Sequence, residues 1–373
     1  MAASGLELDA AASEVIQIPK AIPEFSALRV AVIGVLERPP RISYKQASTV
    51  LSEIPTGVVP YISTTDLVVF KIHSCGLRAD PAKARRDADD AAALLDVNSQ
   101  AGPLILTPVQ KSKIQILSDL HLEAPKGYDV FEITPSAPCL ALIGDIGYTN
   151  DDAYFTFLEK QLANFKTVFI ILGNHEPYHS SWMTSKQKIK EFEAKLAAKA
   201  ASSSLGQLVF LDQTRHDLSP DITILGCTLF SDVIPSQTDY VSFGLNDFYH
   251  IEDWTVEKHN EAHASDLTWL NSQVDAISKA EPNRKIVILK HHSPTKSPRS
   301  SDPAHAQSNI SSGFSSDLSG EICWTSAAVK VWAFGHTHFN IDYMEGGKRI
   351  VANQRGYYFS QAADFDGVKT IEI

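Results

Sequence analysis

Cysteine is scarce in this chain, and none of its four cysteines has a close partner in the sequence. Cys75, Cys139, Cys227 and Cys323 are widely separated, and no C-x-x-C pair occurs among the 373 residues. This spacing argues against a zinc knuckle or a disulfide framework and favours reduced thiols in a cytosolic compartment.

Targeting segments and long apolar runs are also lacking. Residues 1–17 carry three acidic residues and no basic one, unlike the start of a signal peptide. No apolar run reaches the length of a membrane span. We therefore expect a cytoplasmic protein with no membrane partner.

Positive charge is in deficit. The chain has 33 Lys and Arg against 44 Asp and Glu, which gives a formal net charge of -11. A general nucleic-acid binder carries a basic surface, so this balance disfavours nucleic acid as a partner. Hydrophobic residues make up 44% of the chain, enough for a sizeable core.

The first part of the chain, residues 1–110, gives weak signals. We expect strands at 29–36 and 66–72, and a helix beginning at Pro81 and ending near Leu95. Residues 66–95 weakly resemble the back end of a nucleotidyltransferase-like region of some fungal proteins. They lack a Gly-Ser and paired-Asp motif, so we expect 1–110 to be a small appendage without catalysis of its own.

Residues 111–373 alternate between strand and helix patterns, which predicts an α/β fold in layers. Expected strands are Ile114–Leu117, Cys139–Ile143, Val168–Leu172, Ile222–Cys227, Lys285–Leu289 and Val329–Phe334. Expected helices are Asp152–Phe165 and Trp182–Ala201. Gly346-Gly347 predicts a hairpin, and the Ser-rich stretch 293–320 predicts a long loop that is either a lid or disordered.

Five short polar clusters follow expected strands. They are Asp119-Leu120-His121, Gly144-Asp145, Gly173-Asn174-His175-Glu176, His291-His292 and Gly335-His336-Thr337-His338. Open α/β sheets bind ligands at the carboxyl ends of their strands, so these clusters are expected to meet. Two residues that are two positions apart on an extended segment point to the same side, so Asp119 and His121 are expected to reach one ion.

Each cluster has an ordinary structural explanation when it is considered alone. Asp-x-His is typical of a turn or a cap, Gly-Asp of a tight turn, and Gly-Asn-His of a left-handed turn. Five of them after successive strands, with oxygen and imidazole donors and no thiolate, favour divalent cations instead.

The order and spelling of the five clusters resemble the calcineurin-like metallophosphoesterases, over roughly residues 112–373. This resemblance implies a layered β-sandwich flanked by helices, and two divalent metal ions (Mn, Fe, Zn or Mg). It also implies which residues bind them. The first ion would take Asp119, His121 and His338, the second would take Asn174, His291 and His336, and Asp145 would bridge both.

The resemblance further implies a hydroxide between the metals as the nucleophile. His175 is expected near the leaving oxygen, as a hydrogen-bond or proton donor rather than a ligand. His292 is the alternative ligand to His291 and otherwise a candidate substrate contact. Arg355 is either a second substrate contact that faces a phosphate or the partner of a carboxylate that fixes a turn.

The function implied is hydrolysis of a small phosphomonoester or phosphodiester. The Asp-Arg pair that protein serine/threonine phosphatases carry after Gly-Asp is absent from Gly144-Asp145-Ile146-Gly147, which argues against that class. Alternatives are a nuclease, a protein phosphatase, and a scaffold that binds metal without turnover. The presence of His175 disfavours the scaffold, because a protein without turnover has less need of this residue.

Overall fold

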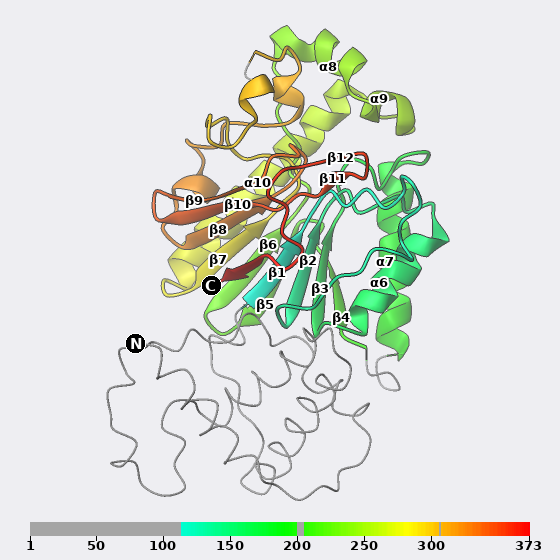
Figure 1. The fold of residues 1–373 in the computed structure, drawn as a ribbon. Coiled ribbons are helices and arrows are strands. Elements are labelled where there is room, and N and C mark those ends of the chain that lie inside the picture. Colours follow the sequence, from blue (N-terminus) through cyan, green and yellow to red (C-terminus); the bar gives the residue numbers. More distant parts are fainter. Residues whose placement is uncertain (1–112, 200–204, 306) are drawn as a thin grey trace, which may run out of the picture. The chain divides into compact units, whose positions relative to one another are not determined.

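A computed structural model describes residues 113–199, 205–305 and 307–373 (Figure 1). Contacts within the chain divide it into two units, Met1–Lys111 and Ser112–Ile373. The strands expected at 29–36 and 66–72, the helix expected from Pro81, and the nucleotidyltransferase-like stretch all lie outside the described residues.

The first of two large sheets has the strand order β13-β1-β2-β3-β4. Its parallel strands are β1 (Lys113–Leu117), β2 (Cys139–Ile143), β3 (Thr167–Ile171) and β4 (Gln207–Phe210). The edge strand β13 (Thr370–Glu372) pairs antiparallel with β1. Every residue of β2 and β3 is buried, as expected of parallel strands that are covered on both faces.

The second sheet has the order β5-β6-β7-β8-β10-β9. Its parallel strands are β6 (Ile222–Gly226), β7 (Lys285–Leu289), β8 (Val329–Phe334) and β10 (Lys348–Ala352). Antiparallel strands β5 (Thr214–Ser219) and β9 (Ile341–Glu345) form its edges. The turn between β9 and β10 contains Gly346 and Gly347, both with positive φ, which confirms the predicted hairpin.

Alternate side chains of each strand point to opposite faces of its sheet, and this alternation builds three apolar layers. Ile114 and Ile116 of β1 pack between the two sheets, together with Val287 and Leu289 of β7. Leu117, on the other face of β1, packs toward the helices that cover the first sheet. The core is thus a sandwich of two sheets with helices outside.

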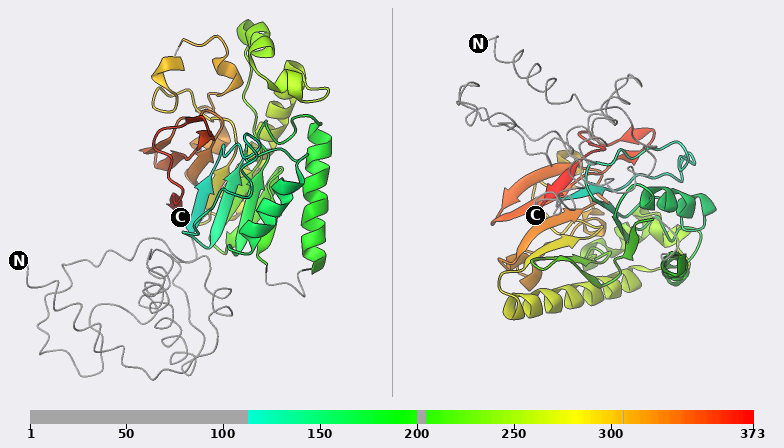
Figure 2. Two further views of the ribbon diagram at one scale, coloured as in Figure 1. Left: turned by 45° about the vertical axis from the view of Figure 1, so that its right-hand side comes forward. Right: turned by 90° about the horizontal axis from the view of Figure 1, so that it is seen from below.

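Helices cover both outer faces (Figure 2). Helices α6 (Asp152–Leu162) and α7 (Trp182–Lys199) pack on the first sheet, and α10 (Val256–Ala280) and α11 (Ile322–Thr325) pack on the second. Helix α10 begins where the side chain of Thr255 accepts a hydrogen bond from the backbone N–H of Lys258. The predicted layered α/β fold is confirmed.

Loops and short helices lie beyond the carboxyl ends of the parallel strands (Figure 1). They include η3 (Pro235–Gln237), α8 (Thr238–Gly244), α9 (Asp247–His250), η4 (Pro303–His305) and η5 (Ser311–Gly313). The stretch 293–320 is structured where it is described. Phe314 and Ile310 pack against Val241 and Leu245, so this segment and α8 form one layer above the strand ends.

The remaining differences from the expected elements lie at their ends. Helix α6 stops at Leu162 rather than Phe165, and β3 begins one residue earlier than predicted. Trp254 precedes α10 and packs against Trp182 and Phe230. Among the residues that the structure describes, no helix has both the length and the apolar character needed to cross a bilayer.

We predict that residues 112–373 fold without the first 111 residues, because both sheets are covered on their two faces by elements of this unit. A chain truncated to 112–373 should unfold in one cooperative thermal transition. Circular dichroism of the truncated and full-length chains would measure this. A truncated chain that aggregates or melts without a sigmoidal transition would contradict the prediction.

Candidate metal centre

The polar clusters predicted from sequence meet at the edge where the parallel strands of both sheets end. Asp119, Asp145 and Asn174 follow β1, β2 and β3 of the first sheet. His291 and His336 follow β7 and β8 of the second sheet. Donors from two separate sheets therefore share one buried space.

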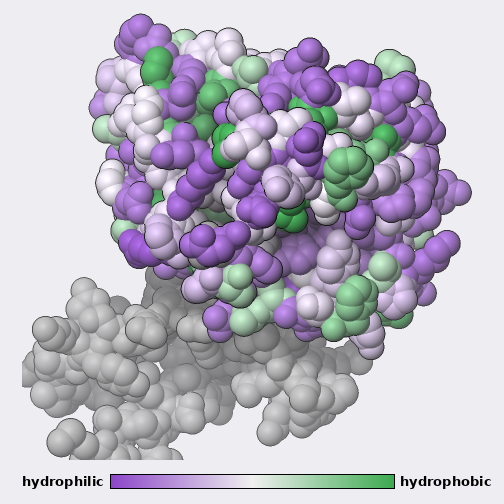
Figure 3. All heavy atoms as spheres, turned by 90° about the horizontal axis from the view of Figure 1, so that it is seen from above, coloured by the Kyte–Doolittle hydropathy of each residue, from purple (hydrophilic) through white to green (hydrophobic). Residues whose placement is uncertain are grey.

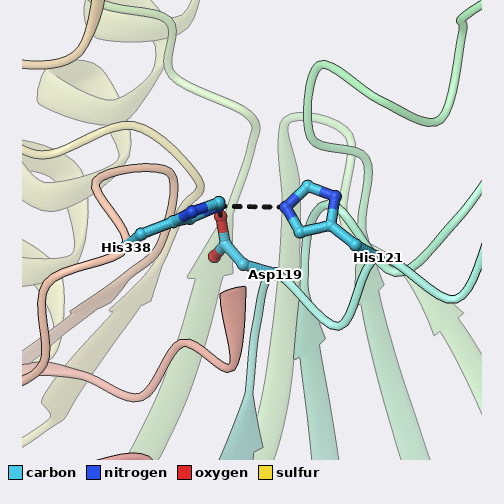
Figure 4. Close-up of side chains that lie close together, drawn as sticks. All are labelled: Asp119, His121 and His338. Carbon is cyan, nitrogen blue, oxygen red and sulfur yellow. Dashed lines mark hydrogen bonds and ion pairs between the residues drawn. The ribbon is translucent and has the colours of Figure 1, made fainter. Parts of the chain in front are cut away.

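The first group of donor atoms comes from Asp119, His121 and His338 (Figure 4). Nε2 of His338 lies 3.3 Å from Oδ1 of Asp119 and 3.0 Å from Nε2 of His121. Asp119 and His121 are buried, whereas His338 is partly exposed. The backbone N–H of His336 donates to both oxygens of Asp119, each at 3.1 Å, which fixes the carboxylate.

The second group comes from Asp145, His291 and His336. Nε2 of His291 lies 3.4 Å from Oδ2 of Asp145 and 3.1 Å from Oδ1 of Asn174. Asp145 also belongs to a further group with His121 and His175, whose donor atoms lie within 4.8 Å of one another. Asp145 thus stands between the donors of the two sheets.

Three glycines make this convergence sterically possible. A Cβ at Gly144 would run into the ring of His291, and one at Gly173 into Oδ1 of Asp145. A Cβ at Gly335 would overlap Oγ of Ser118 and lie 2.5 Å from Oδ2 of Asp119. The glycine in each of these three clusters is therefore required by the closeness of a neighbouring donor.

The backbone is left-handed at five of the donors, and this corrects the extended geometry that was expected for Asp119 and His121. Their φ angles are 53° and 45°, and those of Asp145, His336 and His338 are 55°, 70° and 50°. Non-glycine residues seldom adopt such angles, and each costs roughly 1–3 kcal/mol. The paired donors meet through strained turns and not through strand alternation.

The donor chemistry fits divalent cations. The carboxylates, the amide and the imidazoles are oxygen and nitrogen ligands that such ions accept, and no thiolate lies among them. Nδ1 of His291 lies 3.0 Å from the carbonyl of Ile143, and Nε2 of His336 lies 3.3 Å from that of Gly313. Each ring donates a proton to its carbonyl, which leaves the other nitrogen as a lone-pair donor for a cation.

Glu123 was not predicted as a site residue, although its carboxylate forms hydrogen bonds with two histidines of the site. Its Oε1 lies 3.1 Å from Nδ1 of His121 and 2.9 Å from Nδ1 of His175. Burial would raise the pKa of Glu123, but the two rings outweigh it and lower the pKa, so the carboxylate accepts both N–H groups. The spacing Asp119-x-His121-x-Glu123 was the available signal.

The buried charges of the site depend on one another. Burial would raise the pKa of Asp145, but His291 and His175 hold it well below its usual range. Burial lowers the pKa of His175, yet Asp145 and Glu123 raise it to about 9. The backbone N–H of His175 also donates to Oδ1 of Asp145, at 2.8 Å.

Glu176 ties two of the clusters together by hydrogen bonds to the backbone. It accepts the N–H groups of Gly173, Asp145 and Ile146 at 2.7, 3.1 and 2.9 Å. Burial and the neighbouring Asp145 raise the pKa of Glu176 to about 8. Its position in the third cluster is thus explained by support of the loops that carry Asp145 and Asn174.

The carboxylate of Asp247 fixes the orientation of the Asn174 amide. It accepts hydrogen bonds from Nδ2 of Asn174, at 2.8 Å, and from the hydroxyl of Tyr178, at 2.6 Å. This pairing fixes the amide so that Oδ1 of Asn174 faces His291. The order of nitrogen and oxygen in the amide follows from these partners.

The segment 353–357 forms hydrogen bonds with the two loops that contain Asp119 and His338. Oε1 of Gln354 accepts the N–H of His338 at 2.6 Å, and the N–H groups of Arg355 and Gly356 donate to the carbonyls of Ser118 and Asp119. The hydroxyl of Tyr357, the next residue, lies 3.2 Å from Nε2 of His175. Sequence alone did not indicate this supporting role.

The two candidate substrate contacts lie beside residues of the donor clusters. The guanidinium of Arg355 donates to the carbonyl of Leu120 at 3.0 Å and lies over the ring of Phe131, so its partner within the described part of the chain is a carbonyl and not a carboxylate. His292 is fully buried, with its ring 4.1 Å from that of His336. A substrate contact by either residue stays a prediction.

Comparison with known proteins gives one family. The sequence profile described as calcineurin-like phosphoesterase matches residues 112–340. An uncharacterized protein of Acanthamoeba polyphaga mimivirus is 27% identical over 262 residues, which is 65% of this chain and 91% of that protein. The crystal structure of the phosphopantetheinyl hydrolase of Mycobacterium tuberculosis aligns with a TM-score of 0.49 at 14% identity, over 66% of this chain and 89% of that one.

We predict that Gly335→Ala weakens both the fold and the metal centre. The new methyl group must displace Ser118 or the carboxylate of Asp119, neither of which is exposed. Overpacking of this kind costs about 1–3 kcal/mol. Chemical denaturation and metal content by elemental analysis would measure the two effects.

Gly320→Ala is the matched control, because a Cβ there meets no atom within 4 Å. It should leave stability and metal content close to those of the wild type. If Gly335→Ala behaved like Gly320→Ala, the close approach of the β8 loop to Asp119 would not matter for the site.

Proposed function

The chain belongs to the calcineurin-like phosphoesterase family of metal-dependent enzymes, and on this premise we propose that it hydrolyses a small phosphomonoester or phosphodiester at a centre of two divalent metal ions. The observation that carries the proposal is the pair of donor groups that share the neighbourhood of Asp145. Each group offers three donor atoms within 4.8 Å of one another, so the two groups provide places for two ions.

We assign the donors to two ions. Asp119, His121 and His338 would hold one ion, because their donor atoms form one group. Asn174, His291 and His336 would hold the other, and Asp145 would be shared. His291 is preferred to His292 because its Nε2 faces Asp145 and Asn174.

When bound, such ions would supply an activated water as nucleophile and Lewis acidity for a phosphoryl oxygen. The protein would position the substrate against these ions and supply a proton to the leaving group. His175 is suited to that second task, because Glu123 accepts from its Nδ1 and leaves Nε2 facing the partly buried Tyr357.

The charge around His175 supports a role as acid. Asp145 and Glu123 raise its pKa to about 9 against the effect of burial, so the ring carries a proton at neutral pH. Bound cations would lower this pKa toward neutrality, where proton donation to a leaving oxygen is most effective.

The proposed activity is tested with metal-loaded, full-length protein on three substrate types. p-Nitrophenyl phosphate reports on monoesters, bis-p-nitrophenyl phosphate on diesters, and cyclic nucleotides on cyclic diesters. Turnover that depends on added divalent metal supports the proposal. Bound metal without turnover on any of the three would favour a metal-binding scaffold instead.

We predict that Asp145→Asn weakens metal binding. The substitution removes the charge of the carboxylate that would be shared by both ions, while it keeps the side-chain shape. Metal content after dialysis should fall, and the activity should fall with it. Asp239→Asn, the same chemical change at an exposed position of α8, should retain both. Full metal content in Asp145→Asn would remove Asp145 from the shared position.

We predict that His175→Ala keeps the metal but lowers turnover by about 10²–10⁴-fold, the usual contribution of a general acid. The loss should be smaller for p-nitrophenyl phosphate than for an alkyl phosphate, because p-nitrophenolate leaves with little need of a proton. Elemental analysis and kinetics on both substrates would measure this. The exposed His305→Ala serves as the control.

Equal losses on the two leaving groups would contradict an acid role for His175. Undiminished activity of His175→Ala on the alkyl phosphate would contradict any role in the reaction. A loss of metal from this variant would instead make His175 a ligand, in line with the group that it forms with His121 and Asp145.

A further inference from the structure

A short hairpin beside the donor groups carries a column of stacked rings. It consists of β11 (Gly356–Tyr357) and β12 (Ser360–Gln361), paired antiparallel. The ring of Tyr357 stacks on that of His121, with centroids 4.1 Å apart. The ring of Phe359 is parallel to that of Tyr357, at 5.4 Å and an interplanar angle of 5°. The column leads from a proposed metal ligand to solvent.

The outer end of this column is unusually exposed. Phe359 is 78% exposed, and the adjacent Tyr358 is 62% exposed. Two neighbouring aromatic side chains in water forgo the free energy that burial would provide. The fold does not require them there, because the hairpin is held by its backbone. Gly356 donates to the carbonyl of Asp119, and Ala362 donates to that of Arg355.

Tyr357 of the column lies next to the residue that is proposed to protonate the leaving group. The hydroxyl of Tyr357 lies 3.2 Å from Nε2 of His175, the atom assigned above to the leaving oxygen. A ring attached to that oxygen would lie beside Tyr357, whose neighbour in the column is Phe359. Because the hairpin is tied to the loop of Asp119, the rings form a fixed platform rather than a mobile arm.

The surface around the strand ends favours a small ligand over a protein partner. On the face shown in Figure 3, hydrophobic side chains are dispersed among hydrophilic ones and do not merge into one broad patch. Protein-binding faces usually carry larger contiguous apolar areas. A few isolated aromatic rings next to a catalytic centre are better suited to stacking with one planar group.

We propose that Phe359, backed by Tyr357, forms a stacking subsite for a planar aromatic leaving group, so that the preferred substrates are phosphate esters of aromatic alcohols or of nucleosides. This inference rests on the proposed function, since it places the phosphate at the metal centre. Offset stacking adds binding free energy beyond the area that is buried, and it accepts many ring types.

The test compares two phosphonates that are not hydrolysed, benzylphosphonate and ethylphosphonate, on metal-loaded full-length protein by calorimetry; in both, a carbon atom replaces the leaving oxygen. Both present the same charged group to the metals, and only one carries a ring. We expect the wild type to bind benzylphosphonate more tightly by roughly five- to tenfold, in line with one stacking contact. In Phe359→Leu the ratio of the two dissociation constants should fall toward one.

Phe243→Leu is the matched control. Phe243 lies on α8 and is also 78% exposed, so the same change there alters the surface equally but not the column. Its ratio should equal that of the wild type. An unchanged ratio in Phe359→Leu, or an equal fall in Phe243→Leu, would overturn the subsite.

Two further outcomes also overturn it. One is that the wild type binds both phosphonates equally, or binds neither of them. The other is a change from dimer to monomer in Phe359→Leu with no change in the ratio, which would make the hairpin a contact between copies of this chain. Hydrolysis of p-nitrophenyl phosphate by the same preparation shows whether the proposed function stands when the subsite fails.

Discussion

The close approach of the two sheets at the carboxyl ends of their parallel strands is the constraint on which the site depends. Asp119 and Asp145 come from one sheet and His291 and His336 from the other, so the donors meet only if nothing bulky separates the loops. That condition explains why Gly335 lies against Asp119 and why no side chain can replace it without displacement. The apolar layer between the sheets, with Ile116 and Leu289, fixes the spacing.

The same approach concentrates strain and charge in one place. Asp119, His121, Asp145, His336 and His338 have left-handed backbone angles, and Asp119, Asp145 and His291 are almost completely buried. Sites of this kind are maintained by the rest of the fold at a cost in stability. Hydrogen bonds to the backbone offset part of that cost, as where Glu176 accepts three N–H groups of the loops.

Sequence reasoning predicted most of the parallel strands and the polar side chains that lie together in the structure, because each polar cluster follows an apolar run, which is a local pattern. β2, β7 and β8 were predicted to the residue. Features that depend on contacts between distant parts of the chain were either not predicted or predicted wrongly. The left-handed turns at Asp119 and His121 were expected to be extended. The shared acceptor Glu123 was not recognised, and Arg355 binds a carbonyl that no sequence pattern would indicate.

Glu123 connects the two halves of the proposed chemistry. Its single Oε1 accepts from His121, a proposed ligand, and from His175, the proposed acid. A cation bound through Nε2 of His121 would polarise that ring and strengthen its bond to Glu123, because an imidazole that gives up electron density is a better donor. The carboxylate would then accept a weaker hydrogen bond from Nδ1 of His175, and the proton on Nε2 of His175 would be released more easily. Metal binding and proton donation would therefore be coupled through one buried carboxylate.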